Sequence, residues 1–117
     1  MNEAEKSSMI KKSINEIVTE VHLNAIAHGW WEQKRTFGEL VALMHSELSE
    51  ALEEYRNDKP LVYWENGKMK GIATELADCV IRIMDFSGSE GLDLEKIILE
   101  KHEFNKNRPY KHGGKKI

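Results

Sequence analysis

Apolar residues recur along most of the chain at steps of three and four, the spacing of one face of an α-helix. This spacing predicts helices over about residues 8–28, 37–56, 70–87 and 93–105. Four helices with short connections predict an all-α fold, a four-helix bundle that forms one domain over residues 1–117. Residues 1–7 and 113–117 lie outside the periodic segments, and we expect both ends to be flexible.

The expected helices carry signals at their ends. Thr36 and Glu39 have the spacing of a capping box, and Asp93 stands where a side chain caps the last helix. Gly29 can end the first helix. No segment shows a clear strand pattern, although Asn66-Gly67 marks a turn in the loop before the third helix, which could hold a short hairpin.

Charge is unevenly distributed along the chain. Residues 1–100 carry 11 basic and 19 acidic side chains, whereas residues 101–117 carry six basic side chains and one acid. An acidic body with a basic end does not suit stable nucleic-acid binding, which needs a continuous positive surface. It suits a ligand in which a cation bound by carboxylates meets an anionic group.

The sequence shows no feature of a membrane-spanning protein or of a protein from an oxidising compartment. No apolar run approaches the length of a membrane span, and the polar N-terminus lacks the apolar stretch of a signal peptide. The single cysteine, Cys79, cannot form an internal disulfide and is expected to be a small buried residue. We therefore expect a cytoplasmic protein.

Two pairs of acids are the main candidates for chemistry. Glu47 and Glu50 lie three residues apart in the second expected helix, and Glu75 and Asp78 lie three apart in the third. Residues i and i+3 share a helix face, so each pair directs its oxygens to a common spot beside apolar positions. If the two helices pack together, four carboxylates meet.

Two interpretations of these pairs remain open. Exposed acids on helix faces are common and need no function. Four carboxylates at a helix interface, in contrast, must titrate or hold a cation, and Mg²⁺ prefers oxygen ligands and binds substrate phosphates as well.

The order E-x-x-E followed by E-x-x-D resembles the metal signature of the MazG family of all-α nucleoside triphosphate pyrophosphohydrolases. Gly29-Trp30-Trp31 before the first pair agrees with this resemblance, as does the stretch 105–113 (NKNRPYKHG) near the end. The similarity covers about residues 20–115.

The resemblance implies an enzyme that hydrolyses nucleoside triphosphates, either deoxynucleotides or non-standard nucleotides, to a monophosphate and pyrophosphate. It implies Mg²⁺, with Mn²⁺ as a substitute, held by the four acids of the two pairs, and a homodimer or a dimer of dimers. We assign Glu50 as the base that takes a proton from the attacking water.

The substrate-binding candidates are Lys101, Asn105, Arg108 and Lys111, whose polar and cationic side chains would meet the phosphates, and Trp31, whose ring would stack on a base. Basic residues at a helix C-terminus also simply complement the helix dipole, and a tryptophan on a connector can simply cover the core. Two rival functions remain. One is hydrolysis of phosphoribosyl-ATP, within the same superfamily, and the other is a non-catalytic helical oligomerisation module.

Overall fold

The computed structural model describes residues 1–110, without the side chains of residues 7–10. In these residues the fold is mostly helical with one small two-stranded sheet, which confirms an all-α class in its coarse sense. The elements in chain order are α1 (Glu3–Ile10), α2 (Ile14–Ala27), α3 (Phe37–Arg56), β1 (Tyr63–Glu65), β2 (Lys68–Lys70), α4 (Ile72–Ser89) and α5 (Leu94–Lys106).

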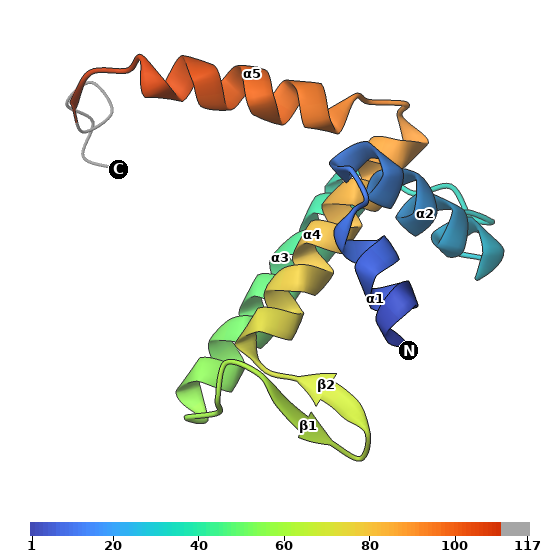
Figure 1. The fold of residues 1–117 in the computed structure, drawn as a ribbon, viewed down its shortest axis with the longest axis vertical. Helices are drawn as coiled ribbons and strands as arrows, with labels where there is room; N and C mark the ends of the chain where they lie inside the picture. The colour runs from blue at the N-terminus through green and yellow to red at the C-terminus, as the bar shows by residue number, and fades with distance from the viewer. Residues whose placement is uncertain (111–117) are drawn as a thin grey trace.

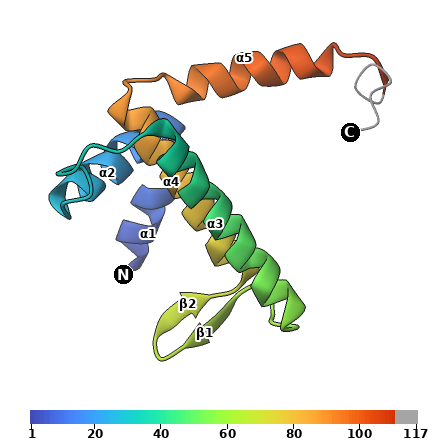
Figure 2. The same cartoon turned by 180° about the vertical axis from the view of Figure 1, so that it is seen from behind.

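The centre of the fold is a hairpin of the two longest helices, α3 and α4, which run side by side (Figures 1 and 2). Helix α2 packs across the end of α4 opposite the strands. Each long helix has a clear start. The Thr36 hydroxyl accepts a hydrogen bond from the backbone N–H of Glu39, which is one of the two bonds of the predicted capping box. The predicted bounds of the helix over residues 37–56 are confirmed.

The first predicted helix, over residues 8–28, is wrong as a single element. Residues 3–10 form α1 and residues 14–27 form α2, with a break between them. Ser13 causes the second start because its side chain accepts from the N–H of Glu16, and the Glu16 carboxylate accepts from the N–H of Ser13 in return. This complete capping box satisfies two donors that a continuous helix would bond internally.

A hairpin of β1 and β2 fills the loop between the two long helices, where the sequence shows no clear strand pattern but allows a short hairpin around Asn66-Gly67. The strands are antiparallel, with Tyr63 opposite Lys70 and Glu65 opposite Lys68. Asn66 and Gly67 form the predicted turn, with φ of 52° and 76°. Two consecutive positive φ angles are those of the tight turn that matches strand twist. The predicted third helix, over residues 70–87, accordingly begins two residues later.

Helix α5 extends away from the α3–α4 hairpin and touches the rest of the chain mainly at its start, where it meets α2 (Figure 1). There Asp93 caps α5 and also accepts a hydrogen bond from the Asn15 amide at 2.7 Å. Helix α5 contains no buried residue. A four-helix bundle is therefore not confirmed, since one of the four predicted helices lies outside the packed group.

The core of the described residues is small. Its buried apolar side chains are Val18, Leu40, Ala51 and Cys79, the last as predicted. Large apolar side chains remain exposed on the three longest elements and on α5, among them Leu48, Leu52, Val80, Ile81, Ile97 and Phe104. Among the described helices, none has both the length and the apolar character needed to cross a membrane.

Candidate functional site

The structure brings three of the four predicted acids together. Glu47 comes from α3, while Glu75 and Asp78 come from α4. Each can offer one carboxylate oxygen such that the three oxygens lie within 4.8 Å of one another. The spacing of three residues along α4 directs Glu75 and Asp78 to the same side, and the pairing of α3 with α4 adds Glu47. We call Glu47, Glu75 and Asp78 the acidic cluster.

Glu47 is buried, with 7% of its surface exposed, and has a charged partner. The Nε–H of Arg82 donates to Glu47 Oε1 at 2.9 Å. The sequence allows Arg82 to pair with Asp78, four residues earlier on the same helix, but its ion pair instead crosses to α3. An interhelical pair of this kind neutralises the most deeply buried acid of the cluster.

Glu75 lacks such a partner. Burial, hydrogen bonding to Glu50 and the nearby negative charges raise the pKa of Glu75 from 4.5 to about 7. Its Oε2 atom is buried and has no hydrogen-bond partner among the described residues. A buried acceptor without a donor is costly, so this oxygen marks a point where a proton or a cation would stabilise the folded chain.

Asp78 is perturbed in the same direction. Burial raises the pKa of Asp78, the Glu47 carboxylate raises it further, and the positive charges of Arg82 and Lys68 lower it. The net direction is upward, so the two cations do not balance the burial and the negative charge. The acidic cluster therefore carries an excess of negative charge that favours a bound cation.

Glu50, the predicted base, lies at the edge of the cluster. It is exposed, and it influences Glu75 through a hydrogen bond and through its charge. It also lines a hollow of about 280 Å³ on the side of the strands, together with Glu54, Tyr63 and others. The Tyr63 hydroxyl contacts both carboxylate oxygens of Glu54, at 3.1 and 3.0 Å. Glu50 thus has access both to solvent and to the cluster.

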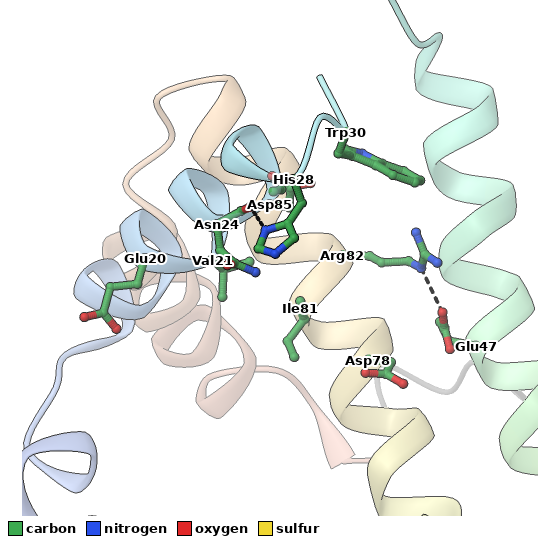
Figure 3. Close-up of a pocket in the computed structure, with 11 residues that line it drawn as sticks. Glu20, Val21, Asn24, His28, Trp30, Glu47, Asp78, Ile81, Arg82 and Asp85 are labelled. Carbon is green, nitrogen blue, oxygen red and sulfur yellow. Dashed lines mark hydrogen bonds and ion pairs between the residues drawn. The ribbon is translucent and has the colours of Figure 1, made fainter. Parts of the chain in front are cut away.

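A larger cavity of about 640 Å³ opens beside the acidic cluster, toward α2 (Figure 3). Glu47, Asp78 and Arg82 form part of its wall, and Asp85 lines it further along α4. The rest of the wall combines apolar and polar side chains from α2, the following connector and α4: Glu20, Val21, Asn24, Ala25, His28, Trp30 and Ile81. A mainly apolar cavity with a few polar groups is the usual form of a small-molecule site.

The two adjacent tryptophans have different places. Trp30 lines the cavity, and the Arg35 guanidinium lies 3.7 Å from the centre of its ring. Trp31, the predicted stacking residue, instead donates from its indole Nε1 to Asp85 Oδ1 at 2.9 Å. The two rings are neighbours in the sequence, and only the tertiary structure places Trp30 on the cavity wall and Trp31 in a hydrogen bond with Asp85.

Sequence reasoning missed Asp85 and His22. Asp85 is buried at 8% exposure and its Oδ1 lies 2.8 Å from His22 Nδ1. The edge of the His22 ring also contacts Trp31, with ring centres 5.5 Å apart. A signal was present, because Asp85 interrupts an apolar stretch and lies seven residues after Asp78, on the same helix face.

The basic candidates of the C-terminal segment do not reach the acidic cluster of their own chain. Lys101, Asn105 and Arg108 lie on α5 or directly after it (Figure 1). We call α5 and the described residues after it the arm, because this segment extends away from the α3–α4 hairpin. Lys101 and Arg108 both approach the ring of Phe104, at 4.7 and 5.7 Å. Lys111 lies outside the described residues.

Comparison of the chain with known protein families, with curated proteins and with solved structures found no match.

Proposed function

We propose that the protein is a Mg²⁺-dependent nucleoside triphosphate pyrophosphohydrolase that resembles the MazG family. The observation that carries the proposal is the acidic cluster, in which three carboxylates from two helices converge beside a cavity of about 640 Å³. Such a cluster alone is common in proteins. The upward pKa shift of Glu75 and its buried oxygen without a partner add the charge imbalance that a cation would relieve.

The donor set suits a hard divalent cation. Carboxylate oxygens are the ligands that Mg²⁺ prefers, and Mg²⁺ commonly keeps several waters and binds phosphates as well. Glu47, Glu75 and Asp78 would hold the ion, with Glu50 at the exposed edge as the fourth acid. When bound, Mg²⁺ neutralises phosphate oxygens and lowers the pKa of a coordinated water.

The side chains around the ion have separate roles in the proposal. Water attacks the α-phosphorus of the triphosphate, pyrophosphate leaves, and Glu50 takes the proton of the attacking water. A carboxylate that is exposed yet close to the cluster can exchange that proton with solvent. Arg82, fixed by Glu47 at the cavity wall, is placed to contact a phosphate oxygen. Trp30 would give a base apolar contact at the cavity wall, beside the guanidinium groups of Arg35 and Arg82, which lie 3.7 and 5.4 Å from the centre of its ring.

We also propose that the protein acts as a homodimer in which α5 of one chain serves the site of the other. The arm leaves apolar side chains such as Ile97 and Phe104 exposed, and it carries Lys101 and Arg108 away from the acids of its own chain. An isolated helix of 13 residues is marginally stable in water, so a covering surface would stabilise α5. The partner's Arg108 would then meet the phosphates.

The proposal is tested by incubating the protein with a panel of NTPs, dNTPs and phosphoribosyl-ATP in the presence of Mg²⁺. We expect release of a nucleoside monophosphate and pyrophosphate from at least one nucleoside triphosphate. Glu50→Gln and Asp78→Asn should abolish turnover and leave the helical circular dichroism intact, because an amide preserves shape and removes charge. The exposed Glu90→Gln, at the end of α4, is the matched control.

Thermal unfolding gives a second test of metal binding, and this test does not need a substrate. Mg²⁺ or Mn²⁺ should raise the melting temperature of the parent by mass action on the folded state and have little effect on Asp78→Asn. If the parent has the same melting temperature with and without the ion, the proposed metal site is wrong. Release of orthophosphate instead of pyrophosphate would place the cleaved bond elsewhere.

The exposed apolar surface of α3, α4 and α5 favours one alternative, a non-catalytic helical oligomerisation module. This alternative predicts self-association without turnover. It also predicts that substitutions in the acidic cluster leave every ligand response unchanged. The same panel and the same thermal scans therefore separate it from the enzyme.

A further inference from the structure

Asp85 combines deep burial with hydrogen bonds to only one of its two oxygens. The residue is 8% exposed, and its hydrogen bonds to Trp31 Nε1 at 2.9 Å and to His22 Nδ1 at 2.8 Å both fall on Oδ1. An ionised carboxylate only accepts hydrogen bonds, so both ring nitrogens act as donors. Two donors from two different elements hold the carboxylate group in one orientation.

The second oxygen, Oδ2, has no hydrogen-bond partner among the described residues, although Asp85 forms part of the cavity wall. Unlike Glu75 Oε2, this oxygen is not itself buried, so a ligand in the cavity can reach it. An oriented acceptor without a donor, at the surface of a cavity, is therefore suited to a donor that a ligand brings.

The position of Asp85 relative to the acidic cluster indicates what kind of ligand fits. Asp78 and Asp85 are seven residues apart on α4, which corresponds to about 10 Å along the helix. Both line the same cavity, and Trp30, Val21 and Ile81 lie along its wall (Figure 3). A nucleotide with its phosphates at the cluster would extend its flat, polar-edged base along this wall.

We infer that Asp85 is a specificity-determining residue that accepts a hydrogen bond from an N–H group on the edge of a nucleobase, with His22 and Trp31 as positioning residues. The inference rests on the proposed function for the class of ligand. It goes beyond that function because it names the group that reads the base. A site built to bind an N–H rejects an analogue in which the N–H is missing.

A purely structural role is the rival explanation. Through its two contacts, Asp85 links α4 to α2 and to the connector after it. Removing the side chain could therefore loosen the packing without any effect on recognition. Asp85→Asn separates the two roles, because its amide oxygen can still accept from His22 and Trp31 while an NH₂ donor replaces Oδ2.

The experiment measures binding of free nucleosides to the full chain in the presence of a chelator, by calorimetry or by protein NMR. Nucleosides are used in matched pairs, each with its base N–H either free or capped by methyl groups. The parent should prefer the free form by roughly 10- to 100-fold, as expected for a hydrogen bond to a charged acceptor. Asp85→Asn should lose or reverse this preference.

Two further variants test the positioning role of Trp31 and provide a control. Trp31→Phe removes one of the two donors that orient Asp85, so the preference should weaken while nucleosides still bind. Glu90→Gln, an exposed acid at the end of the same helix, should match the parent. Circular dichroism and melting temperature confirm that each variant is folded.

Three results would overturn the inference. The first is a parent that binds no nucleoside at millimolar concentration. The second is an Asp85→Asn variant that keeps the parent's preference. The third is a variant in which capped and free nucleosides lose affinity equally, which is the result of a structural role. The assay needs neither metal nor turnover, so a failed hydrolysis panel with an intact nucleoside preference would refute the proposed function and leave the base site standing.

Discussion

Replacing Glu75 by glutamine should stabilise the metal-free protein at alkaline pH. The Glu75 carboxyl is packed against other acids, and burial and hydrogen bonding to Glu50 raise its pKa from 4.5 to about 7. Ionising it in the folded chain therefore opposes folding. Glutamine has nearly the same shape and cannot ionise, so the variant removes this cost.

The direction with pH follows from the two pKa values. Below pH 4.5 Glu75 is protonated in both the folded and the unfolded chain, and its contribution is fully present. Between pH 4.5 and about 7 the unfolded chain has lost this proton while the folded chain retains it, so stability falls as the pH rises, and the loss is complete above about pH 7. The shift corresponds to a loss on the order of 3 kcal/mol. Asp78, whose pKa is also raised, adds to the same trend.

The assay is urea unfolding in the presence of a chelator, at pH 5 and at pH 8. Urea is preferred because it adds no ions that screen charges. The parent should be less stable at pH 8 than at pH 5 by roughly 3 kcal/mol. In Glu75→Gln most of this difference should be absent. Glu90→Gln should follow the parent at both pH values, since its carboxylate lies outside the cluster.

Two results would refute this reasoning. A parent whose free energy of unfolding is the same at pH 5 and pH 8 would show that Glu75 ionises in the folded chain without cost. A Glu75→Gln variant that keeps the full pH dependence would show that the cost lies in another group. Either result would also remove the charge imbalance that supports the proposed metal site.

Two further predictions concern packing and the arm. Gly88→Ala should lower the free energy of unfolding by about 1–3 kcal/mol in urea, because the added Cβ would lie 2.5 Å from His22 Cβ. Gly38→Ala should be neutral or stabilising, because its Cβ would meet only Thr36 Oγ1, at an ordinary contact distance of 3.9 Å. Equal stabilities of the two variants would contradict this packing of α2 on α4. Arg108→Ala should lower kcat/KM by roughly ten- to a hundredfold, as expected for loss of a charged contact to phosphate. Mixing it with inactive Asp78→Asn should restore activity, because one mixed site then has intact acids and the partner's Arg108; no recovery would place the arm outside the partner's site.

Local features of the fold could be predicted from the sequence because they depend on neighbours along the chain. The helix over residues 37–56 and the caps at Thr36 and Asp93 follow from side chains within one turn. The Asn66-Gly67 turn follows from the conformations these residues tolerate. The break at Ser13 was also a local signal, but the apolar period that continues through it concealed it.

In the candidate site, too, local features could be predicted from the sequence and long-range ones could not. The sequence places Glu75 and Asp78 on one helix face and Glu47 on another helix, since a spacing of three residues is a property of the helix itself. It does not bring Glu47 within 4.8 Å of the other two, because that distance depends on how α3 packs on α4. The arm is similar: sequence predicts the helix of α5, but whether it joins the bundle depends on long-range contacts.

The sequence by itself determined the helix over residues 37–56, the caps at Thr36 and Asp93, and which acids share a helix face, because each depends on groups a few residues apart. Only the tertiary structure decided that Arg82 pairs with Glu47 across the hairpin and that Trp30 rather than Trp31 lines the cavity. It also decided that Asp85 is largely buried at the cavity wall and accepts both of its hydrogen bonds on one oxygen. Burial and desolvation are set by whatever packs against a group, and for Asp85 those neighbours lie more than fifty residues away along the chain.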